Sequence, residues 1–165
     1  MNDENKKKID VIFENLTAIH PLLGKTFTKA IRSKTMLTPG TLFVVGVLVK
    51  HKKLTMSEIA CRLSVPKPHV TGMVDKLIAE DLVERLSDPD DRRIVYIQLT
   101  DKGHETYTTV RTLISEELHQ KLQLLSDEQI SVLSIASQQV KDILMTVLLD
   151  SSSNLEPRCK ELKDK

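Results

Sequence analysis

The 165-residue chain is poor in cysteine and in aromatic residues. Its two cysteines, Cys61 and Cys159, are too few and too far apart in sequence for a multi-disulfide scaffold or a zinc ribbon. Only three Phe and two Tyr are present, with no Trp. This scarcity argues against a β-sandwich and against a single-strand binder that stacks bases on aromatic rings.

Long apolar runs and an excess of one charge are also lacking. No apolar stretch approaches the roughly 20 residues needed to cross a bilayer, and the polar start of the chain does not read as a signal peptide. With 40% hydrophobic and 28% charged residues, the composition predicts one globular, cytoplasmic unit. The net charge of +1 gives no bulk attraction to nucleic acid.

Apolar residues spaced by three and four predict a helix over residues 9–31. Pro21 predicts a kink or short break at His20–Pro21. Thr38 followed by Pro39 predicts the start of a second helix that ends near His51.

The next segment has the pattern of a helix-turn-helix. Thr55 and Glu58 form a T-x-x-E capping box that opens a short helix ending at Leu63. After Pro66 and Pro68, apolar residues at helical spacing predict a second helix. Any αα-hairpin looks similar, so this pattern alone is weak evidence.

A β-hairpin is predicted directly after these helices. The stretches LVERL and IVYIQL flank the polar turn SDPDDRR, and a β-bridge to Leu54 is possible. Thr100 then caps a long helix, and Ser126 with Gln129 opens the last one. We therefore expect a mainly α fold with a small β-hairpin wing, a winged helix-turn-helix.

Four regions follow: an N-terminal dimerisation helix at 1–34, a winged helix-turn-helix at 35–100, C-terminal dimerisation helices at 101–150 and a flexible tail at 151–165. The terminal helices carry more apolar surface than a compact winged helix can cover, which indicates a homodimer. No Ser/His/Asp group, Gly-rich phosphate loop or His/Cys pair at ligand spacing is present, so we expect no enzyme, cofactor or metal site.

These segments resemble the MarR family of bacterial transcription regulators. LTMSEIACRLSV is similar to the family's first helix of the helix-turn-helix, VTGMVDKL to its recognition helix and DLVERLSDPDDRRIVYIQLTDKG to its wing and the following cap. The resemblance implies a two-fold dimer whose winged helices each bind half of an inverted-repeat operator in double-stranded DNA.

The sequence departs from the family pattern at three places. The turn, commonly Gly-containing, has Ser64. Position 72, often an arginine in the recognition helix, is Gly72, which either allows close approach of DNA or weakens binding. Asp90 stands where some members carry an arginine, so Arg92 and Arg93 are the only cations of the wing.

The candidate DNA-binding residues lie in three places. The recognition helix carries four of them, of which Lys67 and His69 are the candidates for base contact. One wing arginine is expected in the minor groove, with Asp88 or Asp91 holding the other in place. The full set is Arg62, Lys67, His69, Thr71, Lys76, Arg92 and Arg93.

The resemblance also implies a small anionic or phenolic effector in the cleft between dimer body and winged helix. Its candidate lining residues are His20, Lys25, Met36 and Arg111. The predicted function is a sequence-specific homodimeric regulator, most simply a repressor, under possible ligand control. The alternative is a winged-helix protein-interaction module without sequence-specific DNA binding, which the near-neutral charge and Gly72 motivate.

Overall fold

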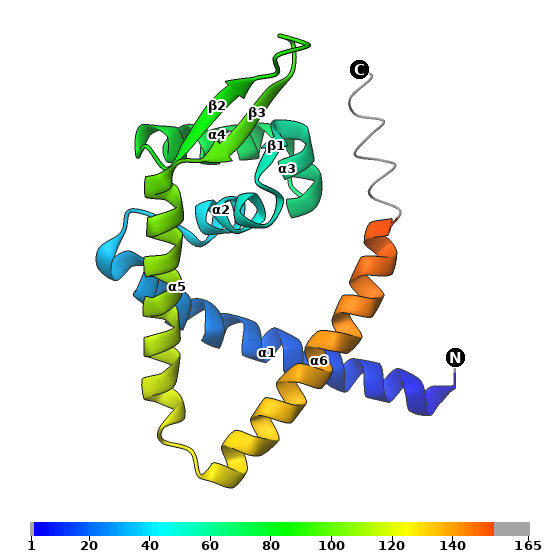
Figure 1. The fold of residues 1–165 in the computed structure, drawn as a ribbon. Helices are drawn as coiled ribbons and strands as arrows, with labels where there is room; N and C mark the ends of the chain where they lie inside the picture. The colour runs from blue at the N-terminus through cyan, green and yellow to red at the C-terminus, as the bar shows by residue number, and fades with distance from the viewer. Residues whose placement is uncertain (1, 154–165) are drawn as a thin grey trace.

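The computed structural model describes residues 2–153, without the side chains of residues 30, 33, 34 and 147–153. A small winged-helix body is flanked by three long helices (Figure 1). The elements are α1 Asp3–Lys34, α2 Pro39–His51, β1 Lys53–Thr55, α3 Met56–Leu63, α4 Lys67–Ala79, β2 Val83–Ser87, β3 Val95–Leu99, α5 Asp101–Leu122 and α6 Asp127–Ser153. The expected fold class, mainly α with a β-hairpin wing, is confirmed. Of the predicted tail, residues 154–165 lie outside the described part.

Helix α1 is continuous through Pro21, which contradicts the predicted short break and leaves the alternative, a kink, as a prediction. Proline removes one backbone N–H donor, and here the Thr17 carbonyl is the group left without it. Both residues are exposed, so water can satisfy that carbonyl at little cost. The rest of the helix is held by its own ladder and, toward its C-terminal end, by packing on α5 and α2.

The predicted helix starts are confirmed by their side-chain caps. The Thr38 hydroxyl accepts from the Thr41 N–H, and Pro39 occupies the first turn of α2. At α3, the Glu58 carboxylate accepts from the Thr55 N–H at 2.8 Å, and the Thr55 hydroxyl accepts from the Glu58 N–H at 3.3 Å. Ser126 and Gln129 form the same reciprocal pair before α6. These caps satisfy N–H groups that a helix start leaves without partners.

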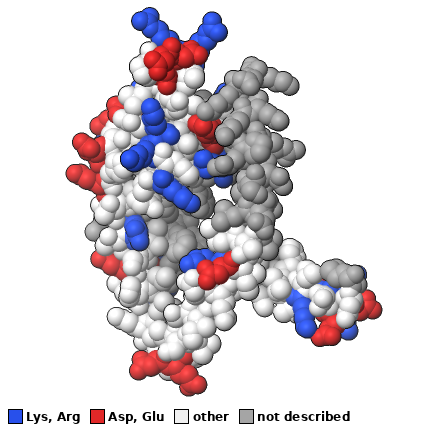
Figure 2. Space-filling model, turned by 45° about the vertical axis from the view of Figure 1, so that its right-hand side comes forward, with Lys and Arg blue, Asp and Glu red and all other residues white. Residues whose placement is uncertain are grey.

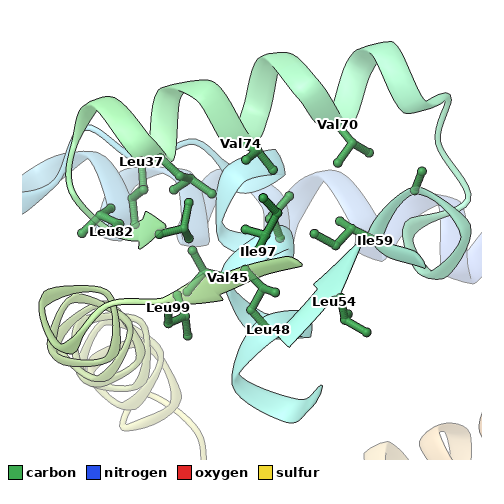
Figure 3. Packing of buried hydrophobic residues seen from close by; sticks show 14 of the residues in the cluster. Leu37, Val45, Leu48, Leu54, Ile59, Val70, Val74, Leu82, Ile97 and Leu99 are labelled. Carbon is green, nitrogen blue, oxygen red and sulfur yellow. The ribbon is translucent and has the colours of Figure 1, made fainter. Parts of the chain in front are cut away.

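The core lies where α2, α3 and α4 meet the sheet (Figure 3). Val70 and Val74 of α4 point toward Ile59 of α3 and Ile97 of β3. All four are fully buried, as are the α2 residues Val44, Val45 and Leu48. Burying each such side chain contributes about 1.5–3 kcal/mol relative to leaving it exposed. Helix α4, the predicted recognition helix, is therefore fixed to the body by one apolar face, and its opposite face is exposed to solvent.

The sheet has three antiparallel strands in the order β1-β3-β2. β1 pairs with β3 through Leu54 and Ile97, which confirms the bridge anticipated at Leu54. β2 and β3 pair from Val83 opposite Leu99 to Ser87 opposite Val95. Ile97 and Leu99 are buried, whereas the strands' outer ends continue beyond the core as the wing.

Large apolar side chains remain exposed along α1 and α6. Neither the N-terminal half of α1 nor α6 lies against the winged-helix body in Figure 1. Among residues 2–153, no helix is both long enough and apolar enough to cross a membrane. The exposed apolar residues of the two helices are Ile9, Val11, Ile12, Phe13, Leu16, Ile19, Leu22, Leu23, Ile130, Val132, Leu133, Ile135, Val140, Ile143 and Met145.

The turn between α4 and β2 is closed by the start of α5. Asp81, with φ 57°, turns the chain out of α4. The Thr100 hydroxyl donates to the Asp81 carbonyl at 2.8 Å, and the Thr100 N–H donates to the Leu82 carbonyl at 3.1 Å. Lys102 Nζ donates to the Glu80 carbonyl at 2.7 Å. A side chain at Gly103 would overlap the Leu82 carbonyl oxygen, so this approach requires glycine.

We predict that Gly103→Ala lowers the free energy of unfolding by about 2 kcal/mol or more, because the added methyl group must displace backbone. Gly46→Ala is the matched control, since a Cβ there meets Tyr107 at an ordinary 3.9 Å. The control is expected to be neutral or slightly stabilising. Urea unfolding followed by circular dichroism measures both variants. Equal stability for Gly103→Ala and Gly46→Ala would contradict the proposed close approach.

Candidate nucleic-acid interface

Helices α3 and α4 are joined by a tight turn at Ser64. Ser64 takes the left-handed conformation, φ 53° and ψ 39°, which favours glycine. The turn is fixed by two backbone hydrogen bonds, from the Ser64 N–H to the Cys61 carbonyl and from the Val65 N–H to the Ala60 carbonyl, each 3.1 Å. Serine therefore replaces the family's usual glycine without loss of the turn.

The solvent face of α4 carries most of the predicted helix contacts. Lys67, His69 and Lys76 are exposed, and none of these side chains forms a hydrogen bond or ion pair with a described residue. Thr71 is half-buried, and its hydroxyl donates to the Lys67 carbonyl at 3.1 Å. The Thr71 oxygen therefore has acceptor capacity left, but its proton is engaged. Arg62, at the end of α3, is also exposed.

An ion pair joins the recognition helix to the wing strand. Arg85 Nη2 of β2 lies 2.7 Å from Asp75 Oδ1 of α4. About half of each side chain is exposed, so the pair contributes little to stability. The pair sets the direction of both side chains, because the Asp75 carboxylate and the Arg85 guanidinium are turned toward each other.

The wing tip is shaped by aspartates that bind backbone. Asp88 Oδ1 accepts from the N–H groups of Asp90, at 2.9 Å, and Asp91, at 3.1 Å. Asp91 Oδ1 accepts from the Arg93 N–H at 2.9 Å. Asp91 therefore holds Arg93 through its backbone N–H, and among the described residues no ion pair joins Asp88 or Asp91 to a wing guanidinium.

Both wing guanidinium groups are exposed and form no ion pair with a described residue. Figure 2 shows basic side chains projecting at the tip of the hairpin beside a group of acidic ones, with further basic side chains on the face below. Lower on the wing, Lys53 Nζ lies 4.4 Å from the centre of the Tyr96 ring, a cation–π contact across β1 and β3. The wing is therefore a ridge whose turn is held by hydrogen bonds from backbone N–H groups to Asp88 and Asp91. Its two cations, Arg92 and Arg93, are exposed to solvent.

A comparison with protein families bears on this arrangement. The family model described as the MarR family matches residues 37–95, from the start of α2 to the start of β3. This segment of the chain is therefore similar to the MarR family.

Individual relatives and solved structures are also similar to this chain. The HTH-type transcriptional repressor MdtR of Bacillus subtilis is 36% identical over 93 residues, which cover 56% of this chain and 60% of MdtR. The crystal structure of the YusO protein from Bacillus subtilis has 26% identity and a TM-score of 0.67, and covers 83% of this chain and 96% of that one. A crystal structure of a mutant MarR from E. coli complexed with operator DNA has 24% identity, a TM-score of 0.62 and coverage of 81% and 95%, and shows a shared fold.

The four predicted effector residues do not line one cavity in the described part of the chain. A cavity of about 470 Å³ lies between the end of α1, the α4–β2 turn and the start of α5. Met36 lines it, but His20, Lys25 and Arg111 do not, and they lie exposed on α1 and α5. Its lining is Arg32, Thr35, Met36, Leu37, Glu80, Leu82, Lys102 and Thr106. Within residues 2–153 no group of three His, Cys, Asp or Glu is placed to hold a metal ion.

Sequence reasoning missed the roles of Asp75 and Lys53. Asp75 lies on the polar side of α4 and Arg85 on the outer side of β2, but their pairing depends on how the strand crosses the helix. The position of Lys53 over the Tyr96 ring follows from the β1–β3 register. No local sequence signal could have found either contact.

The pKa of the Asp88 carboxyl is lowered from its ordinary value of 3.8, because the N–H groups of Asp90 and Asp91 bind the charged form. Lys53 and the Tyr96 side chain lower it further. The contribution of this carboxylate to stability is therefore present above the unfolded pKa of about 3.9 and is lost as pH falls through the lower folded value. A carboxyl titration by NMR is expected to place Asp88 below 3.8.

We predict that Asp88→Ala loosens the wing tip while global unfolding stays nearly unchanged. Without this acceptor, the amides of Asp90 and Asp91 are expected to exchange with solvent faster. Hydrogen exchange by NMR measures this. Asp90→Ala is the control, because the Asp90 carboxylate accepts no hydrogen bond from a described residue. The account of the turn is wrong if both variants exchange alike.

Proposed function

We propose that this chain is a homodimeric transcriptional repressor that binds an inverted-repeat operator in double-stranded DNA in the cytoplasm. The observation that carries the proposal is the pairing of two free basic elements on one winged helix. Lys67, His69 and Lys76 lie on the solvent face of α4, and Arg92 and Arg93 lie at the tip of the wing that extends past it. The relatives named as transcriptional regulators support the same function.

The two elements suit different grooves. An α-helix fits the major groove, and residues near its N-terminus reach base edges, so Lys67 and His69 of α4 are the proposed base contacts. A cation on a narrow ridge suits the minor groove, where the potential is most negative over A·T tracts. The fixed turn at Asp88 and Asp91 presents Arg92 and Arg93 for that contact.

A second copy of the chain would cover the apolar faces of α1 and α6. Phe13 is 67% exposed and Ile135 is 62% exposed, and both belong to long rows of exposed apolar residues. Exposed apolar surfaces of this extent mark an interface. A two-fold dimer would also place two recognition helices against the two halves of a palindromic site.

Control by a small anionic or phenolic effector is a further part of the proposal. The cavity beside Met36 combines an apolar floor, Leu37 and Leu82, with the cations Arg32 and Lys102. It joins the end of α1 to the turn after α4, so a ligand bound there would change the angle between the dimer helices and the recognition helix. Such a ligand acts only if it binds the DNA-competent and incompetent forms with different affinities.

We predict that Lys67→Ala and Arg92→Ala each weaken operator binding by about tenfold, since each removes a groove contact of about 1–3 kcal/mol. The operator is first selected from random duplexes by the wild-type protein, and fluorescence anisotropy then gives the Kd. Arg111→Ala is the matched control, because Arg111 is an exposed cation of α5 outside the winged helix.

The outcome also separates the repressor from the alternative. A wild-type dimer that prefers no duplex over random DNA would refute operator recognition and favour a winged-helix protein-interaction module. If Arg111→Ala weakens binding as much as the two test variants, the contacts are not those proposed here.

We predict that Leu16→Glu converts the dimer to a monomer, because a charge in the middle of the apolar row of α1 would be buried without a partner. Glu14→Lys, an exposed change on the polar side of the same helix, is expected to leave the dimer intact. Sedimentation equilibrium measures the molecular mass of each. A dimeric Leu16→Glu protein would place the interface elsewhere.

A further inference from the structure

Gly72 lies inside the recognition helix at a position where neither the backbone conformation nor the packing requires glycine. It is exposed, it lies in the middle of α4, and its φ is not positive. A Cβ built at this position meets no described atom within 4 Å. Glycine is nonetheless among the poorest helix formers, so an alanine here would be accommodated and would stabilise α4.

The position of Gly72 on the helix is the centre of the solvent face. It is two residues from both Val70 and Val74, about half a turn, and these two side chains are fully buried. Pro68 lies one turn before Gly72 and Asp75 almost one turn after it. Asp75 Oδ1 lies 2.7 Å from Arg85 Nη2 of β2, so this side chain is directed toward the strand. The helix backbone is therefore bare at its outermost point, with His69 and Lys76 to one side.

Resting on the proposed function, we infer that Gly72 sets how deeply the recognition helix enters the major groove of the operator. Without a Cβ, the backbone of α4 can approach the base edges closely. This seating brings Lys67, His69 and Lys76 within reach of bases. Gly72 itself offers only Cα–H surface, because its N–H lies within the helical ladder. Its contact with DNA is one of shape, and it is made only when the helix is fully inserted.

The alternative is that Gly72 marks a lost contact. Under that alternative the missing side chain leaves a gap between α4 and DNA, and filling it would strengthen binding. The two interpretations predict opposite effects of the same substitutions, so a size series at this position decides between them.

The experiment compares Gly72→Ala, Gly72→Ser and Gly72→Arg with the wild-type dimer. The Kd is measured for the duplex that wild type selects from random DNA and for a random duplex of equal length. Gly72→Ala is expected to raise Tm by about 2–4 °C through helix propensity. It is expected to weaken operator binding at least about tenfold, because the methyl group holds the helix away from the bases.

Binding to random DNA provides the readout that a merely structural role would not change. It depends on phosphate contacts and not on deep insertion, so Gly72→Ala and Gly72→Ser are expected to leave it within about twofold. Gly46→Ala, a helix glycine of α2 with room for a Cβ, is the matched control and should change neither Kd.

Two results would overturn the inference while the proposed function stands: operator binding by Gly72→Ala as tight as wild type, or tighter binding by Gly72→Arg. A wild-type protein with no preferred duplex would overturn the proposed function and this inference together.

Discussion

The close contact between Gly103 and the Leu82 carbonyl holds α4, the β-hairpin and α5 in one unit. Leu82 follows the recognition helix and precedes β2, while Gly103 lies in the first turn of α5. Thr100 and Lys102 add hydrogen bonds to the same turn. Helix α4, the wing and α5 therefore meet at one point, the turn between α4 and β2. The cavity beside Met36 adjoins this turn, because Leu82 and Lys102 belong to the contacts at the turn and also line the cavity.

Helix caps were the part of the fold that the sequence predicted best. Thr55 with Glu58 and Ser126 with Gln129 are local signals, since the donor and acceptor lie three residues apart and need nothing else. The break at Pro21 was wrongly predicted because a missing N–H matters less at an exposed site, where water replaces it. Local chemistry thus predicted where helices begin better than where they are interrupted.

The candidate site was predictable in its residues but not in its contacts. Lys67, His69, Arg92 and Arg93 were found from spacing and resemblance, and all four are exposed. The pairing of Asp75 with Arg85 joins residues ten positions apart on different elements, and depends on the angle between α4 and β2. The sequence identified the wing aspartates as part of a turn. Their carboxylate oxygens could equally have accepted hydrogen bonds from arginine side chains or from backbone N–H groups. Only the folded hairpin decides between the two.

These contacts show how the acidic and basic side chains of the nearly neutral winged helix are distributed. Residues 51–110 carry nine basic and ten acidic side chains, which by count alone opposes DNA binding. Asp75 is paired with Arg85, and the carboxylates of Asp88 and Asp91 accept backbone N–H groups. Their charge remains, but their oxygens are held at the turn and at β2, while Arg92 and Arg93 project free. Under the proposed function, few cations are then available for phosphates, so we expect weak nonspecific attraction and discrimination that depends on how closely α4 fits the groove. The low net charge and the absence of a side chain at Gly72 would then both make operator binding depend on a close fit between α4 and the groove.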